Sequence, residues 1–191
     1  MHEIEMKFKV DDEQQLVSKL EELQYKASVR RTEEDIYYSA PDRDFAKTDE
    51  ALRFRNVFLV DERGAAFDQA NILTYKGPKQ GNKGKIRKEV EVPFYRFSEI
   101  ETMKEMLDLL GYKKVLTVCK HRTFYYLTQS NLEVTLDTVA GLGTFVELEI
   151  RSENTETAMQ QIEDLASKLG LDKEERRSYL ELLLEKGKDV N

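Results

Sequence analysis

The sequence predicts an α+β protein built on an antiparallel sheet, and two observations lead to that fold class. Most of the chain alternates between polar and apolar residues with a period of two, which is typical of strands with one face buried. Four segments instead carry apolar residues at helical spacing, and they do not alternate regularly with the strands. This order favours hairpins over the strand-helix-strand repeat of a parallel sheet.

Each predicted helix has an apolar stripe and a recognisable start or end. Ser98 and Glu101 have the spacing of a capping box, Gly111 and Gly170 follow two of the helices, and Asp172 precedes the last. The helices are expected at 12–24, 99–110, 155–169 and 173–186.

Between the helices, eight segments have strand periodicity. They are 2–10, 28–40, 51–60, 71–77, 85–92, 114–127, 131–137 and 144–151. A chain of 191 residues without a Pro/Gly/Ser-rich linker is expected to form one domain, residues 1–191.

The composition argues against two classes of partner. With 37 acidic and 30 basic residues the net charge is −7, which does not favour a protein that coats nucleic acid. The sequence has no apolar run of about 18 residues, so no membrane helix is expected. Cys119 is the one cysteine, which fits a reducing compartment and predicts a cytoplasmic protein.

The strands divide their charged and apolar residues between two faces. In 2–10, Glu3, Glu5 and Lys7 share one face while Ile4 and Met6 share the other, because residues two apart in a strand project to the same side. The same division recurs in the other strands. Their charged faces carry Arg53, Arg55, Lys76, Lys85, Arg87, Glu89, Glu91, Lys120, Arg122, Glu133, Asp137, Glu147, Glu149 and Arg151.

Two arrangements of these faces are open. The charged faces can be the solvated outside of a sheet packed on one core. However, like charges stand two residues apart, as in Arg53/Arg55 and Glu147/Glu149, and the amphipathic helices need an apolar surface to cover. If the helices pack outside a closed sheet, the charged faces point inward, and such a lumen suits a highly charged ligand because buried charges need partners.

A triphosphate with Mg²⁺ matches such a lumen. Arginine and lysine bind phosphate oxygens, and carboxylates hold hard divalent cations. Other chemistries find less support. The Gly77–Lys85 segment lacks the P-loop spacing and is followed by Ile86 instead of Ser or Thr, so a mobile hairpin loop is expected there. His2 and His121 are too scattered to form a metal cluster.

Glu3-Ile4-Glu5-Met6-Lys7 has the ExExK pattern that opens the CYTH superfamily, the triphosphate tunnel metalloenzymes. The sequence resembles this family over essentially its whole length. The further matching segments, in the family's order, are 52–55, 74–78, 87–91, 120–122, 136–137 and 141–149.

The resemblance implies a closed eight-stranded antiparallel tunnel with a charged lumen and helices outside. It implies Lys7 and Glu5 as catalytic residues and Mg²⁺ or Mn²⁺ as the cofactor. The implied metal ligands are Glu3, Glu5, Glu89, Asp137, Glu147 and Glu149. The implied triphosphate-binding residues are Lys7, Arg53, Arg55, Lys76, Arg87, Lys120 and Arg122, with Lys85 and Glu91 less distinctive.

Three interpretations of the activity remain. Segments 32–38, 141–145 and 176–183 resemble the class IV adenylate cyclase branch, so conversion of ATP to cyclic AMP and pyrophosphate is expected first. The alternative is a triphosphatase acting on tripolyphosphate, thiamine triphosphate or nucleoside triphosphates. The third is a non-catalytic polyphosphate or nucleotide sensor, which the many carboxylates disfavour. The sequence identifies no base-binding residues, and the resemblance to cyclases suggests a homodimer.

Overall fold

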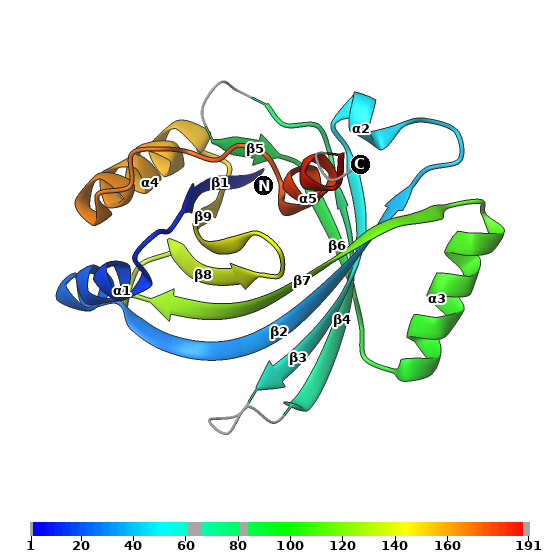
Figure 1. The fold of residues 1–191 in the computed structure, drawn as a ribbon, viewed down its shortest axis with the longest axis horizontal. Helices are drawn as coiled ribbons and strands as arrows, with labels where there is room; N and C mark the ends of the chain where they lie inside the picture. The colour runs from blue at the N-terminus through cyan, green and yellow to red at the C-terminus, as the bar shows by residue number, and fades with distance from the viewer. Residues whose placement is uncertain (1, 61–65, 81–83, 189–191) are drawn as a thin grey trace.

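The fold is a nearly closed antiparallel barrel with helices on its outside (Figure 1). A computed structural model describes residues 2–60, 66–80 and 84–188. The strands in this part of the chain are β1 (His2–Lys9), β2 (Lys26–Ser39), β3 (Ala51–Val60), β4 (Ala66–Lys76), β5 (Lys85–Arg87), β6 (Glu89–Phe94), β7 (Lys113–Tyr126), β8 (Glu133–Val139) and β9 (Gly143–Ser152). The helices are α1 (Glu13–Glu22), α2 (Phe45–Thr48), α3 (Phe97–Leu109), α4 (Thr155–Leu169) and α5 (Tyr179–Lys188).

One continuous stretch of chain, residues 85–94, supplies both edge strands of the sheet and so brings its two edges together. The strand order is β5-β1-β9-β8-β7-β2-β3-β4-β6, and every pair is antiparallel. The two edge strands, β5 and β6, are separated only by Lys88. The strand expected at 85–92 therefore becomes two short strands that pair with opposite edges, β1 and β4, which gives nine strands where eight were expected.

The charged strand faces point into the barrel, as predicted. Glu3, Glu5 and Lys7 are 4%, 7% and 1% exposed although they belong to the polar face of β1. The apolar residues Ile4 and Leu148 face outward into the largest hydrophobic cluster, which joins β1, β8 and β9 to α1 and α4. Because helices cover the outer face, the charged face becomes the lumen.

Two of the predicted helix starts are wrong. Helix α3 begins at Phe97 after Arg96, which makes no side-chain cap, so Ser98 and Glu101 do not form the expected capping box. Helix α5 begins at Tyr179 instead of 173. The preceding segment instead runs along β1, where the Glu175 amide donates to the Lys7 carbonyl at 2.7 Å.

Three other helix ends are capped by short polar side chains or by glycine. Asp12 accepts a hydrogen bond from the Gln15 amide at the start of α1, and Asn154 does the same for Thr157 at the start of α4. Gly170 ends α4 with φ 74°, a left-handed conformation that glycine adopts without strain.

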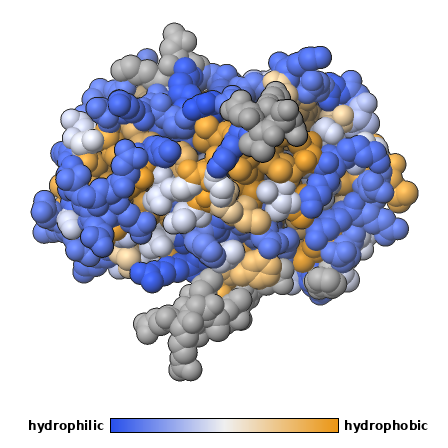
Figure 2. Space-filling model, in the orientation of Figure 1, coloured by the Kyte–Doolittle hydropathy of each residue, from blue (hydrophilic) through white to orange (hydrophobic). Residues whose placement is uncertain are grey.

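Hydrophilic side chains cover most of one face of the molecule, with apolar patches between them (Figure 2). None of the helices in the described part of the chain is long and apolar enough to cross a membrane. The expected loop at 77–85 lies partly outside the described residues. Its first part is held in place, because the Gly77 amide donates to the Lys88 carbonyl at 2.9 Å and Gln80 pairs with Ile86.

Candidate functional site in the barrel lumen

A cavity of about 490 Å³ occupies the lumen. It collects side chains from all nine strands and from α2 and α5. Helix α5 lies near β5 and α2 in Figure 1. The predicted site residues that line it are Glu3, Glu5, Lys7, Arg53, Arg55, Lys76, Arg87, Glu89, Lys120, Arg122, Glu147 and Glu149. Asp137, the remaining predicted residue, is fully buried next to Arg122.

Three carboxylates share the lumen face of β1 and β9. Glu5 pairs directly with Glu149 across the two strands, and Glu3 is two residues from Glu5 on the same face. Burial, together with the charges of Glu3 and Glu5, raises the pKa of Glu149 to about 8. Burial also opposes ionisation of Glu5, yet the ammonium groups of Lys85, Lys7 and Lys76 together outweigh it and lower the pKa of Glu5 to about 2. The group thus concentrates negative charge that a divalent cation would stabilise.

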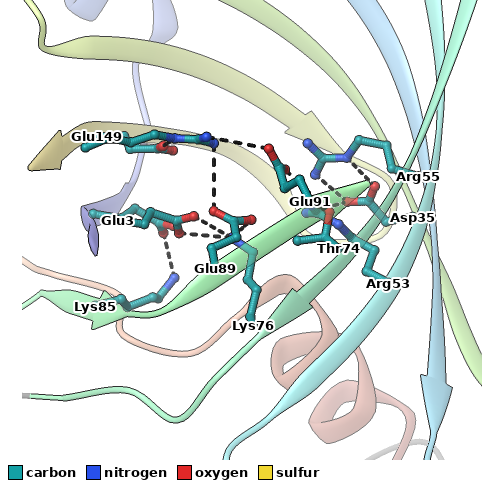
Figure 3. A network of polar contacts seen from close by, with 12 residues as sticks. Glu3, Asp35, Arg53, Arg55, Thr74, Lys76, Lys85, Glu89, Glu91 and Glu149 are labelled. Atoms are coloured by element: carbon teal, nitrogen blue, oxygen red, sulfur yellow. Dashed lines mark hydrogen bonds and ion pairs between the residues drawn. The ribbon is translucent and has the colours of Figure 1, made fainter. Parts of the chain in front are cut away.

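Lysines neutralise Glu3 and Glu5 in this structure, whereas Glu149 pairs with Arg151 at 3.1 Å. Lys76 Nζ lies 2.9 Å from Glu3 and 3.2 Å from Glu89 (Figure 3). Lys85 Nζ lies 2.7 Å from Glu5. The described residues contain no group of three His, Cys, Asp or Glu side chains placed to share a metal. Carboxylate oxygens are the type of ligand that a hard divalent cation prefers. Binding of such a cation requires these oxygens to move away from the Lys76 and Lys85 ammonium groups.

Asp137 holds an arginine in place. Both of its oxygens accept from Arg122, at 2.6 Å from Nε and 2.5 Å from Nη2, and the Tyr179 hydroxyl donates to it at 2.9 Å. Arg122 also donates to Glu147 at 2.5 Å. The carboxylate of Asp137 is therefore engaged by α5 and β7, which makes it a positioning group for Arg122 here.

Two buried acids of β2 are part of the site although the sequence analysis assigned them no role. Asp35 binds the Arg55 guanidinium through two hydrogen bonds of 2.6 and 2.8 Å, and Glu33 lies 2.9 Å from Lys120. Arg55 and Lys120 hold the pKa of both acids well below the usual range, although burial opposes this. The signal was present in the sequence, because Glu33 and Asp35 have the same i, i+2 spacing as Arg53 and Arg55.

Arg53 and Arg87 keep unused donors. The Nε atoms of both guanidinium groups are buried and have no hydrogen-bond partner among the described residues. Arg53 donates to Thr74 at 3.2 Å and lies 3.6 Å from Asp35, while Arg87 lies 3.6 Å from Asp49. Buried donors of this kind normally have a partner, so these two are available to donate to a ligand in the lumen.

Lys7 lies between the charged lumen and α5. Its ammonium donates to the Arg177 carbonyl at 2.5 Å and sits 4.1 Å from the centre of the Tyr179 ring. Burial and the neighbouring Lys85 lower the pKa of Lys7 to about 7, against the opposing charges of Glu147 and Glu5. The segment before α5 thus fixes the position of this side chain.

Figure 3 shows how the two sides of the lumen face each other. Glu3 of β1 and Glu149 of β9 lie on one side, and the arginines of β3 with Asp35 lie on the other. The β6 carboxylates Glu89 and Glu91 lie between them. Such an arrangement can bind a polyanion through the arginines and a cation through the carboxylates.

Comparison with known proteins identifies relatives of this chain. The CYTH domain family model matches residues 1–179. The MJ0240 protein of Methanocaldococcus jannaschii, named as a candidate adenylate cyclase, is 37% identical over 187 residues, which are 95% of this chain and 98% of the relative. Adenylate cyclase CyaB of Aeromonas hydrophila is 26% identical over 183 residues, 93% of this chain and 86% of the relative. The solved structure of PH1819 from Pyrococcus horikoshii OT3 has a TM-score of 0.83 at 41% identity, covering 96% of this chain and 99% of that chain.

Proposed function

Since the chain belongs to the CYTH domain family, we propose that it is a metal-dependent enzyme that acts on a triphosphate. The observation that carries this proposal is the pair of buried, unpartnered Nε donors of Arg53 and Arg87 in a lumen that also holds the Glu3, Glu5 and Glu149 carboxylates. Phosphate oxygens are the natural partners of arginine donors, and carboxylates bind the cation that accompanies a triphosphate.

The basic residues of the lumen fall into two groups. In the first group, Arg53, Arg87 and Lys76 can donate to or neutralise a phosphate chain, and Lys7 lies at the α5 end. Arg55, Lys120 and Arg122 are tied to Glu33, Asp35 and Asp137, so they contribute positive charge while these acids hold them in place.

Mg²⁺ or Mn²⁺ would be held by Glu3, Glu5, Glu147 and Glu149, and it would neutralise charge on the phosphates during the reaction. Glu89 is a neighbour of this group through Lys76, with which it forms an ion pair. Asp137 is assigned to Arg122 instead of to the metal. Lys7 and Glu5, which both line the cavity, remain the candidates for direct contact with the reacting groups.

We assign the reaction to adenylate cyclisation. The ribose 3′-hydroxyl oxygen forms a bond to the α-phosphorus, the bond from that phosphorus to the bridging oxygen breaks, and pyrophosphate leaves while the hydroxyl loses its proton. The cyclase names of the two curated relatives support this reaction. Triphosphate hydrolysis is the second candidate, because the free Arg53 and Arg87 donors bind phosphate whether or not a nucleoside is attached.

Substituting Arg53 and Arg55 separately tests whether the first binds phosphate and the second stabilises the fold. Arg53→Met should weaken binding of tripolyphosphate about 10- to 100-fold, since a hydrogen bond to a charged group contributes about 1.5–3 kcal/mol. Arg55→Met, a matched change two residues away, should instead lower the free energy of unfolding by about 3–5 kcal/mol because it leaves buried acids unpaired. Isothermal titration calorimetry measures the first effect and urea unfolding the second.

One outcome of this experiment would contradict the proposal. Unchanged tripolyphosphate affinity in folded Arg53→Met protein would mean that this guanidinium is not a phosphate ligand. The proposed triphosphate site would then lose its main support.

A further inference from the structure

Tyr179, the first residue of α5, has two different partners in the lumen. Its hydroxyl donates to Asp137 at 2.9 Å, and the centre of its ring lies 4.1 Å from the Lys7 ammonium. The side chain is buried and lines the cavity. One residue of the C-terminal helix thus contacts both a candidate catalytic lysine and the carboxylate that holds Arg122.

A second ring completes the surroundings of the Lys7 ammonium. Phe145 of β9 packs edge-on against Tyr179, with the ring centres 5.2 Å apart and the planes at 63°. The centre of the Phe145 ring lies 5.8 Å from Lys7 Nζ. Aromatic ring faces attract an ammonium group within about 6 Å. The two rings, which we call the aromatic corner, therefore stabilise Lys7 at one place in the lumen.

The acids nearest to Lys7 along the strands have other partners. Glu147 is opposite Lys7 on β9, yet its carboxylate bonds to Arg122 at 2.5 Å. Glu5, two residues before Lys7, pairs with Lys85 at 2.7 Å. The Lys7 ammonium instead contacts the aromatic corner and donates to the Arg177 carbonyl just before α5. Its position therefore depends on where α5 begins.

The start of α5 is itself held in place by a reciprocal cap. The Ser178 amide donates to the Glu181 carboxylate at 2.6 Å, and the Glu181 amide donates to the Ser178 hydroxyl at 3.2 Å. Lys79, in the segment after β4, adds an ion pair to Glu181 at 3.0 Å. The first turn of the helix is thus fixed internally and to the barrel, which gives Tyr179 a defined orientation over the lumen.

We propose that Tyr179 is a positioning residue for the reaction, whose ring, together with that of Phe145, keeps the Lys7 ammonium where it contacts the reacting groups. The inference rests on the proposed function, because it assumes that Lys7 makes that contact. The Tyr179 hydroxyl has a separate role, which is to support Asp137. Helix α5 is then a part of the active site and more than a cover for one end of the lumen.

Two substitutions separate the ring of Tyr179 from its hydroxyl. Tyr179→Met keeps a flexible apolar side chain without the ring, and it should lower kcat about 10- to 100-fold because a displaced reacting group slows the chemical step. KM should change less than about threefold, since Arg53 and Arg87 still bind the phosphates. Tyr179→Phe keeps the ring and should retain kcat within about threefold. Steady-state kinetics with Mg²⁺ and ATP, and in parallel with tripolyphosphate, give both constants.

Leu183→Ala is the control for the packing of α5. Leu183 packs against the same hydrophobic cluster as Tyr179 but is not among the described residues that line the cavity. Its substitution should lower the urea midpoint of unfolding and keep kcat within about threefold of wild type.

Reductive methylation with formaldehyde reports the position of Lys7 without any turnover. Lys7 is 1% exposed, while Lys9 on the same strand is exposed and serves as the internal reference. Mass spectrometry should find Lys7 protected relative to Lys9 in wild-type and Tyr179→Phe protein. The protection should be lost in Tyr179→Met protein, because the ring that covers the ammonium is gone.

Several results would overturn the positioning role. They are an equal loss of kcat in Tyr179→Met and Tyr179→Phe, wild-type kcat in folded Tyr179→Met, and a comparable loss of kcat in Leu183→Ala. If Tyr179→Met does not fold, Phe145→Leu replaces it and should lower kcat at least about threefold, and an unchanged kcat there would overturn the aromatic corner. Wild-type protein that consumes neither substrate would overturn the proposed function, while the methylation pattern still decides whether Tyr179 fixes Lys7.

Discussion

Glu149→Gln is expected to lower metal-dependent turnover of the triphosphate about 10³-fold, since a catalytic metal supplies several kcal/mol of charge stabilisation. The fold should persist, because burial and the neighbouring Glu3 and Glu5 raise the pKa of Glu149 to about 8. The neutral form of Glu149 is therefore already favoured near neutral pH, and glutamine resembles that form. The measurement is the initial rate of phosphate or pyrophosphate release as a function of Mg²⁺ concentration. The variant should also need a higher Mg²⁺ concentration than wild type to reach half of its maximal rate.

Glu133→Gln is the matched control for this substitution. Glu133 lies opposite Glu149 on β8 and lines the same cavity, but its side chain is exposed, and the same acid-to-amide change is made there. Its turnover should stay within about threefold of wild type, because exposed charges are screened by solvent. Full activity in Glu149→Gln, or an equal loss in both variants, would contradict the assignment of Glu149 to the metal.

Leu148→Asp should unfold most of the protein. Leu148 is 0% exposed, lies between Met6 and Val134 on the neighbouring strands, and belongs to the cluster under α1 and α4. The substitution removes apolar contacts and buries an unpaired carboxylate, at a cost of about 5 kcal/mol or more. That loss is comparable with the whole stability of an ordinary domain, so circular dichroism and urea unfolding should show little folded protein.

Glu147→Gln, at the next residue, tests the other face of the same strand. Its side chain lies in the lumen and contacts Arg122, which keeps Asp137 as a partner. We expect a small change in unfolding free energy and a clear loss of metal affinity. Similar mild effects at residues 147 and 148 would mean that the inward and outward faces have been assigned the wrong way round.

The strand faces could be predicted because their geometry is local. Residues two apart in a strand project to the same side wherever the strand lies, so Glu3, Glu5 and Lys7 had to share a face. The need of the helices for an apolar surface then indicated which face turns inward. The resemblance to the CYTH superfamily added the closed tunnel to this reasoning.

The pairing inside the lumen could not be predicted, because it depends on strand order. Lys76 meets Glu3 across 73 positions of sequence, and Arg122 meets Glu147 across 25. Nothing local indicates that Arg55 is tied to Asp35 while Arg53, two residues earlier, keeps a free donor. The contacts of Asp137 could not be predicted for the same reason, since Tyr179 and Arg122 come from other elements.

The start of α5 shows tertiary structure overriding a local signal. Asp172 was expected to precede the last helix, yet residues 171–178 run past β1 and the helix begins at Tyr179. Backbone pairing with β1, including the hydrogen bond from Glu175 to Lys7, competes successfully with helix formation. This route also brings Tyr179 into the lumen.

Product analysis of a single reaction tests the central claim most directly. Purified protein is incubated with ATP and Mg²⁺ or Mn²⁺, and the phosphorus-containing products are followed by ³¹P NMR, with tripolyphosphate in a parallel sample. The account predicts cyclic AMP and pyrophosphate in equal amounts from ATP. Phosphate without cyclic AMP would contradict the cyclase assignment, and failure to consume either ATP or tripolyphosphate would contradict the claim that this lumen processes triphosphates.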